Sequence, residues 1–474
     1  MSSEGLIETE FAKKPRESLL NKSFSNVGIN RYRWWFLIIC NLGQFSYFWV
    51  MSLLSSLQIQ LEEELGLNAS QYGLLQTFGL LGSWVMPLVM GYLIDLLGGR
   101  FGFIYGNLVV TTGLGVLALG GTYKSYPVML AGQFIISFGM DAQNLSRYKL
   151  TCKWFRSKNL GFALAVGASL QSIGGVAGGY ITPTLFNISN DVGFPLFVAF
   201  LIGAFSYVCA HISCEMDYRR ENELKALVHS DEVSEKIKLQ DLKKFKPLFW
   251  LFSSPFIIGQ AAMVPLGFYN SAYLQKRFGF DNDIAGLFGQ FQILAIVILS
   301  PILGYLMNRI GRIGEQMTFA AIIAILSCML MGLLPNCDQC YTPLIPIILQ
   351  GVFGGITGLG IMVGLTRLLD TNMLAIAFGV ACWVMEIIQV FFPYLDGAII
   401  DGTAGTQQGY FWVFIINGFI NILAVIAGFA AIILDRLQGK KLASPLKPET
   451  KEDIDRVIQE HNPDQKKPRP SENI

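Results

Sequence analysis

Apolar runs of about 20 residues recur along most of the chain, and they are the feature that most limits how it can fold. A helix of roughly 20 apolar residues is long enough to cross the hydrocarbon core of a bilayer. Only 15% of the residues are charged and 52% are hydrophobic, whereas a soluble domain carries about 25% charged residues. The sequence therefore predicts an all-α membrane protein and not a set of soluble domains.

The apolar runs give twelve candidate transmembrane spans in two sets of six. They are predicted at about residues 35–57, 72–95, 102–122, 127–149, 160–182, 193–213, 248–272, 284–308, 316–334, 343–366, 373–399 and 410–434. We expect an N-terminal six-helix half at 35–213 and a C-terminal six-helix half at 248–434, joined by a charged cytosolic linker at 214–247. Residues 1–34 are predicted to form a cytosolic tail. Residues 435–474 form a second tail, predicted to be disordered because it is rich in proline and charge.

One short sequence near the end of the second span occurs twice. Residues 91–98 read GYLIDLLG, and residues 304–311 read GYLMNRIG. Each copy ends an apolar segment, and a basic residue follows in both, Arg100 in the first and Arg312 in the second. Duplicated membrane segments are typical of transporters built from two similar halves. The repeat therefore predicts that the two halves are pseudo-symmetric.

Basic residues are distributed unevenly between the predicted loops. All 35 lysines and arginines fall on one side of the membrane except Lys124, Lys276 and Arg277. Basic residues concentrate in cytosolic loops, so this side is predicted to be the cytosol, and an even number of spans puts both termini there. The opposite side holds Asn68 and Asn187, which begin glycosylation sequons.

The sequence carries none of the motifs that would indicate an enzyme or a metal centre. Its three histidines are scattered, and no HExxH motif, paired CxxC motif, phosphate loop or nucleophile–base pair is visible. Most of the eight cysteines lie in apolar segments, while Cys337 and Cys340 fall in a non-cytosolic loop where a disulfide is permitted. Acidic and basic residues nearly balance. We therefore expect no catalytic residues, metal, cofactor or nucleic acid, and we expect a small-molecule substrate and the lipid bilayer as partners.

The first copy of the repeated sequence extends to the pattern Gly-x-Leu-x-Asp-x-x-Gly-x-Arg at residues 91–100. With two six-span halves and a central linker, this pattern resembles the major facilitator superfamily. The resemblance implies a carrier that works by alternating access, in which this loop helps to hold the cytosolic gate closed. We expect gating roles for the loop residues and for the arginine predicted to pair with its aspartate: Gly91, Asp95, Gly98, Arg100 and Arg147.

Five stretches also resemble the lysosomal dipeptide transporter branch of this superfamily. They are residues 46–48, 153–155, 237–243, 247–252 and 277–280. Asp141 stands where that branch has an acidic residue that contacts substrate, whereas Ser172 stands where it has a basic one. The resemblance implies a lysosomal or vacuolar membrane, with the plasma membrane as the alternative. It also implies an accessory membrane glycoprotein as a partner.

Two acidic residues lie deep within predicted spans, where a charge costs at least about 2.5 kcal/mol. Asp141 shares a helical face with Asn144 in span 4, and Glu386 lies near the centre of span 11. For Asp141 we weigh a substrate amine or a proton against a structural ion pair or hydrogen bond. Spans 1 and 7 also line the path in the superfamily that the chain resembles. The predicted substrate contacts are therefore Asp141, Asn144, Gln44, Tyr47, Tyr269, Asn270 and Glu386.

Three functions remain open from the sequence. The first is a carrier of small polar organic solutes such as dipeptides or amino acids, working as a uniporter or coupled to protons through Asp141 or Glu386. The second is a sensor or assembly subunit that derives from a carrier and no longer transports. The third is a porter for another metabolite, such as an organic anion, which would need basic residues at cavity depth like Arg147.

Overall fold

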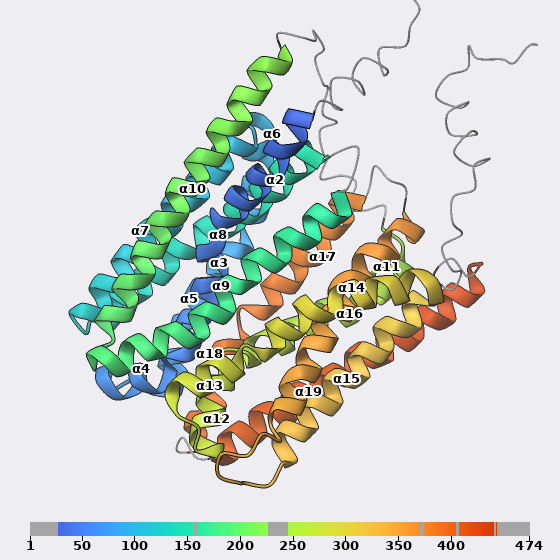
Figure 1. The fold of residues 1–474 in the computed structure, drawn as a ribbon. Helices are drawn as coiled ribbons and strands as arrows, with labels where there is room; N and C mark the ends of the chain where they lie inside the picture. Colours follow the sequence, from blue (N-terminus) through green and yellow to red (C-terminus); the bar gives the residue numbers. More distant parts are fainter. Residues whose placement is uncertain are drawn as a thin grey trace, which may run out of the picture.

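The computed structural model describes residues 27–155, 160–225, 245–369, 374–403, 407–439 and 442. These residues form helices connected by short turns, and none of them lies in a strand. Figure 1 shows two groups of long helices side by side, the first coloured blue to green and the second yellow to red. The first group precedes residues 226–244 in the sequence, and the second follows them.

The N-terminal half contains the helices that precede the linker. They are α2 (Val27–Leu42), α3 (Phe45–Ser56), α4 (Gln58–Leu65), α5 (Ala69–Leu80), the 3-10 turn η2 (Leu81–Trp84), α6 (Met86–Leu97), α7 (Gly99–Thr122), α8 (Tyr126–Phe155), α9 (Leu160–Ser189) and α10 (Gly193–Lys225). Helix α10 continues past the predicted end of its span at residue 213. Its last turns are polar and contain an ion pair between Arg219 and Glu215, one helical turn apart, which supports a helix outside the apolar layer.

The C-terminal half repeats this order. Its helices are α11 (Pro247–Leu266), α12 (Asn270–Phe278), α13 (Asn282–Gly289), α14 (Phe291–Ile310), α15 (Ile313–Leu333), α16 (Leu344–Leu368), α17 (Leu374–Gln389), α18 (Phe392–Gly402) and α19 (Gln407–Leu437). The repeated sequence ends α6 at Gly98 and α14 at Gly311, with φ of 92° and 67°. Only glycine adopts these backbone angles without strain, so the same turn is built twice.

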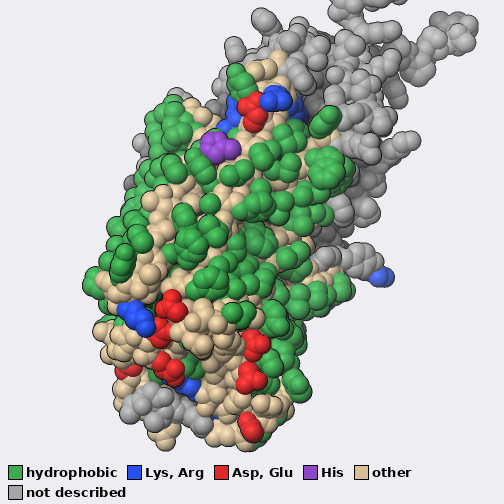
Figure 2. Space-filling model, turned by 60° about the vertical axis from the view of Figure 1, so that its left-hand side comes forward, with side chains coloured by type: hydrophobic (Ala, Val, Ile, Leu, Met, Phe, Trp, Pro, Cys, Tyr) green, Lys and Arg blue, Asp and Glu red, His purple; other side chains and the backbone are tan. Residues whose placement is uncertain are grey.

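Nine helical segments of the described chain are long and apolar enough to cross a membrane. Together with α5–α6, α8 and α9, their order is consistent with twelve crossings. Figure 2 shows charged side chains gathered at the two ends of one face, with hydrophobic side chains covering the surface between them. A hydrophobic surface bounded by charge is expected where lipid surrounds a multi-pass membrane protein.

Several crossings are interrupted within their length, a feature that the sequence did not predict. The interruptions lie at 43–44, 81–85, 267–269, 290 and 390–391. A break in a helix inside a membrane leaves backbone N–H and C=O groups without their helical hydrogen bonds, and these groups must find partners within the protein. Here they also turn polar side chains such as Gln44, Ser83 and Gln290 toward neighbouring helices.

The two halves meet mainly at one end of the bundle. We call this the far end, where α4, α12, α13 and α18 lie, and we call the opposite end, where the described chain begins at Val27, the tail end (Figure 1). One buried apolar cluster contains residues of both halves, such as Tyr72 and Tyr269. The other clusters, nearer the tail end, each contain residues of one half only. The core therefore joins the halves at the far end.

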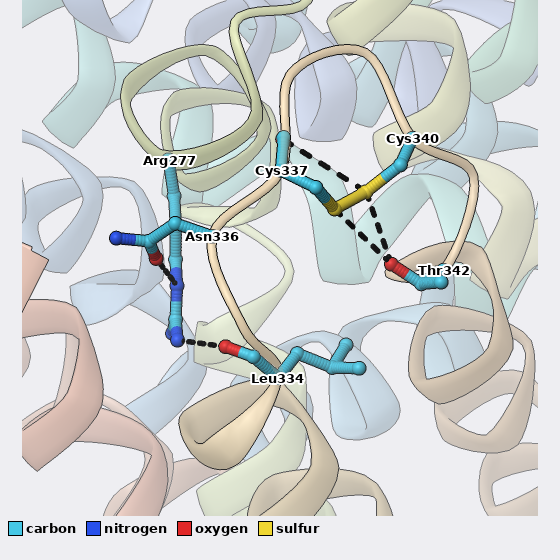
Figure 3. Close-up of a disulfide and its surroundings, with 6 residues drawn as sticks. All are labelled: Arg277, Leu334, Asn336, Cys337, Cys340 and Thr342. Carbon is cyan, nitrogen blue, oxygen red and sulfur yellow. Dashed lines mark hydrogen bonds between the residues drawn. A yellow bond between two sulfur atoms is a disulfide. The ribbon is translucent and has the colours of Figure 1, made fainter.

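The loop that follows α15 at the far end is held by a disulfide and an arginine (Figure 3). Cys337 and Cys340 are bonded, as the sequence permits. Arg277, at the end of α12, donates to the Asn336 side chain and to the backbone carbonyls of Gly332 and Leu334. The loop is thus fixed to the end of α12 within the C-terminal half.

Candidate functional site

A break in the second crossing places a hydroxyl group against Asp141. Gly82 in η2 packs so closely on α8 that a Cβ there would lie 2.5 Å from the Ser137 carbonyl. Its neighbour Ser83 donates a hydrogen bond from Oγ to Asp141 Oδ2 at 3.0 Å. Asp141 is half-buried and makes no ion pair within the described part of the chain. Its negative charge therefore faces a neutral partner.

Glu386 reaches the same region from the other half. Trp383, one turn before Glu386 on α17, donates Nε1–H to the Trp84 carbonyl of η2 at 2.8 Å. The 3-10 turn therefore contacts α8 on one side and α17 on the other. Tyr47, three residues after Gln44, is half-buried on α3. Glu386 Oε2 is buried, and among the described residues it has no hydrogen-bond partner.

The structure brings Gln44 and Asn144 together, as a shared site requires. Gln44 begins α3 at the break in the first crossing, and its Nε2 donates to Asn144 Oδ1 at 3.0 Å. One residue before Asn144, Gln143 donates to the Gly43 carbonyl and to Asn107 Oδ1, both at 2.9 Å. These bonds fasten the break in the first crossing to α8.

Arg147 is fully buried inside the N-terminal half and not near the surface of the tail end. Its Nη1 donates to Asn41 Oδ1 at 3.3 Å, and its guanidinium lies 4.2 Å from the centre of the Tyr148 ring. Its Nε and Nη2 are buried and find no partner in the described chain. The side chain of Asp95, the predicted partner of Arg147, lies outside the described residues.

Tyr269 and Asn270 lie in the far-end contact and not beside Asp141. Both are fully buried at the break between α11 and α12. The Tyr269 hydroxyl donates to the Pro393 carbonyl, and Asn270 Nδ2 donates to Gln350 Oε1 at 3.1 Å. Their contact with substrate remains a prediction, because the closed far end covers them in this structure.

The predicted gating loop forms the turn between α6 and α7 at the tail end. A Cβ added at Gly91 would meet no other atom within 4 Å. Gly98, whose φ is 92°, forms the turn between α6 and α7. Arg100 forms ion pairs with Glu221 at 2.6 Å and Asp217 at 3.5 Å, both on α10. In this structure Arg100 therefore ties two helices of its own half together.

Sequence reasoning missed Asp396 and Asp401 on α18. Asp396 is buried and accepts a hydrogen bond from Asn417 at 2.9 Å. Asp401 crosses to the other half, where it accepts from the backbone N–H groups of Ala69 at 2.9 Å and Ser70 at 2.7 Å. The Ser70 hydroxyl donates to the same carboxylate. A carboxylate at the positive end of α5 is electrostatically favourable.

Two carboxylates from opposite halves, neither of them ion-paired within the described residues, suit a positively charged occupant. An ammonium group or a proton meets this requirement, since a charge at membrane depth is retained where it has a partner. No cluster of three or more metal-ligating side chains is present in the described residues.

Comparison with known proteins gives one family and several relatives. Residues 40–393 match the Major Facilitator Superfamily. The chain is 22% identical over 421 residues to the human "Lysosomal dipeptide transporter MFSD1", which covers 86% of this chain and 87% of that protein. It is 23% identical over 375 residues to the protein of the same name from Danio rerio, covering 77% of this chain and 80% of that one.

Solved structures share the arrangement of helices. A point mutant of the nucleoside transporter NupG gives a TM-score of 0.66 at 13% identity, covering 84% of this chain and 98% of that one. A bacterial homologue of the human lysosomal transporter Spinster, in an inward-facing and occupied conformation, gives 0.65 at 15% identity, covering 87% and 99%. At these identities the likeness concerns the fold.

Proposed function

Because the chain belongs to the Major Facilitator Superfamily, we propose that it is an alternating-access transporter of small organic solutes that carry a protonated amine. Dipeptides are the first candidates, since the curated relatives are named as lysosomal dipeptide transporters. We accordingly propose that the protein is located in a lysosomal or vacuolar membrane, with both termini in the cytosol.

The observation that carries this proposal is a pair of acids from opposite halves whose helices, α8 and α17, both contact η2. Asp141 comes from the N-terminal half and Glu386 from the C-terminal half, and neither is neutralised by a basic side chain among the described residues. Closing the tail end would bring α8 and α17 closer together. Two like charges repel more strongly at shorter distance in a low dielectric. A positive occupant removes that repulsion and so favours closure around substrate.

The closed far end supports a direction for the cycle. With the tails in the cytosol, a structure joined at the far end is an inward-facing state. The Asp95 loop would then re-form the contact between halves at the tail end when the carrier turns outward. In this proposal Gln44, Tyr47 and Asn144 line the site, and Tyr269 and Asn270 become accessible only after the far end opens.

Uptake into proteoliposomes tests the proposal. Asp141→Asn keeps the shape and the Ser83 contact but removes the charge. It should lower uptake of a dipeptide with a free amine at least about 10-fold, because a hydrogen bond to a charged group contributes about 1.5–3 kcal/mol. The N-acetylated dipeptide lacks the positive amine and should be transported poorly by the unaltered protein.

Asp281→Asn is the matched control. Asp281 is an exposed aspartate at the start of α13 whose side chain forms no cap hydrogen bond, so its change should leave uptake unaltered. Equal uptake of the free and acetylated peptides would refute amine recognition. A dipeptide that raises the melting temperature without any flux would instead favour the sensor.

A further inference from the structure

A cavity of about 710 Å³ opens on the outer face of the N-terminal half, at the tail end. It lies between the start of α7 and the last turns of α10, away from Asp141. Both polar and aliphatic side chains line it. Those used below are Arg100, Ile104, His211, Ile212, Tyr218 and Arg219.

The corresponding place in the C-terminal half is filled by the chain itself. There, between α15 and α19, Leu442 leaves a space of only about 20 Å³. Its carbonyl oxygen accepts from the Ile313 N–H at 3.1 Å and from Arg367 at 3.3 Å. Its N–H donates to Asp435 at 3.1 Å. The Leu442 carbonyl oxygen therefore lies at the start of α15. Since α7 and α15 are the third crossings of their halves, the cavity at the start of α7 is the unfilled counterpart of that place.

The polar side of the cavity is suited to an anion. Arg100 uses Nε and Nη2 on acids of α10, while its Nη1 is buried with no hydrogen-bond partner in the described chain. Its guanidinium also lies 5.4 Å from the centre of the Tyr218 ring. Arg219 pairs with Glu215 at 2.7 Å but remains largely exposed, and His211, about two turns earlier on α10, is also exposed and lines the same cavity. The start of α7 adds the partial positive charge of a helix N-terminus.

The apolar side of the cavity continues into a lipid-facing stripe. Phe205, Val208 and Ile212 are 53%, 55% and 46% exposed, and their spacing of three to four residues places them on one face of α10. Figure 2 shows charged side chains at the border of such a hydrophobic surface. An occupant of the cavity would thus have its polar part among arginines and its apolar part along α10.

We propose that this cavity binds the phosphate-bearing headgroup of an anionic phospholipid from the membrane leaflet at the tail end. The acyl chains lie along the α10 stripe, and the phosphate takes the place that the Leu442 carbonyl fills in the other half. Because Arg100 belongs to the predicted gating loop and pairs with acids of α10, the lipid would stabilise the contact between α6, α7 and α10.

Native mass spectrometry of the full-length protein in detergent tests this site. The probes are dioctanoyl phosphatidylinositol 4-phosphate, dioctanoyl phosphatidylcholine and inorganic phosphate. We expect one tightly bound copy of the anionic lipid and much weaker binding of the zwitterionic one. Arg219→Gln should lower the affinity for the anionic lipid about 5-fold, because one basic side chain near an anionic headgroup contributes about 1 kcal/mol to binding. Ile104→Trp should fill the cavity and abolish binding of the one tightly bound anionic lipid.

Arg436→Gln is the matched control, because Arg436 pairs with Glu315 at 3.2 Å beside the filled counterpart. It should leave lipid binding unchanged. Equal binding of both lipids, or equal loss in the Arg219 and Arg436 variants, would overturn the proposal. Displacement of the lipid by millimolar inorganic phosphate would show a free-phosphate site instead. Melting temperatures of the variants distinguish lost binding from lost fold.

Discussion

The contact between Asp401 and α5 predicts how the two ends of the bundle are balanced. Asp401 at the end of α18 accepts hydrogen bonds from Ala69 N–H at 2.9 Å, from Ser70 N–H at 2.7 Å and from the Ser70 hydroxyl. Because these bonds join opposite halves, they exist only while the far end is closed. Asp401→Asn keeps one oxygen acceptor but removes the charge that faces the positive end of α5.

The expected shift is modest but measurable. A carboxylate at a helix N-terminus contributes about 0.3–1 kcal/mol at an exposed position and up to about 2 kcal/mol when partly buried. Asp401 is half-buried, so we take about 1–2 kcal/mol. A change of that size lowers the ratio of far-end-closed to far-end-open molecules by about 5–30-fold. Fold stability within each half should change little, since the bonds lie between the halves.

Spin-label distances across the far end measure that ratio. Labels at Tyr123→Cys and Tyr341→Cys, which are 78% and 66% exposed, report on loops of opposite halves. Asp401→Asn should increase the population at longer distance, while Asp281→Asn, on the same end without a cap bond, should not. Identical distance distributions for the Asp401 variant and the unaltered protein would refute the idea that the contact between Asp401 and α5 holds the far end closed.

Three further outcomes follow from the same geometry. Gly73→Val should also open the far end, because a Cβ at Gly73 would collide with the Pro393 carbonyl on α18; the same spin labels measure it. Glu386→Gln should leave exchange of labelled for unlabelled dipeptide intact while making net uptake insensitive to the pH gradient if Glu386 carries a coupled proton. An unchanged pH response in this variant would exclude Glu386 as the proton carrier and leave Asp141 as the candidate. Asp95→Ala should slow net uptake more than it weakens binding, and a collapse of affinity measured by thermal shift would contradict its gating role.

Much of the architecture follows from patterns that are local in the sequence. Apolar length gives the crossings, and the repeated glycine-rich string gives matching turns at Gly98 and Gly311 because both need a positive φ. Helical spacing and depth also single out Asp141 and Asn144 on one face, and the structure places Gln44 against Asn144. These inferences need only residues within one or two turns of each other.

The features that escaped prediction depend on contacts between distant residues. The 3-10 turn at Leu81–Trp84 follows from the close packing of Gly82 on Ser137, which no periodicity reveals. Asp401 looks like an ordinary loop residue in the sequence, because its partner Ser70 lies in the other half. The Leu442 contact falls in a segment predicted to be disordered. In each case a tertiary contact decides the local structure.

The same pair of crossings carries an aspartate at each end of the bundle. Asp95 ends α6 at the tail end, where α17 of the other half begins, and Asp401 ends α18 at the far end, where α5 begins. Between them, η2 joins Asp141 to α17 through Ser83 and Trp84. A carrier that rocks about its centre can engage only one of these ends at a time. If the Asp95 loop helps to close the tail end as the sequence predicts, neutralising Asp95 and neutralising Asp401 must move the far-end spin-label distances in opposite directions.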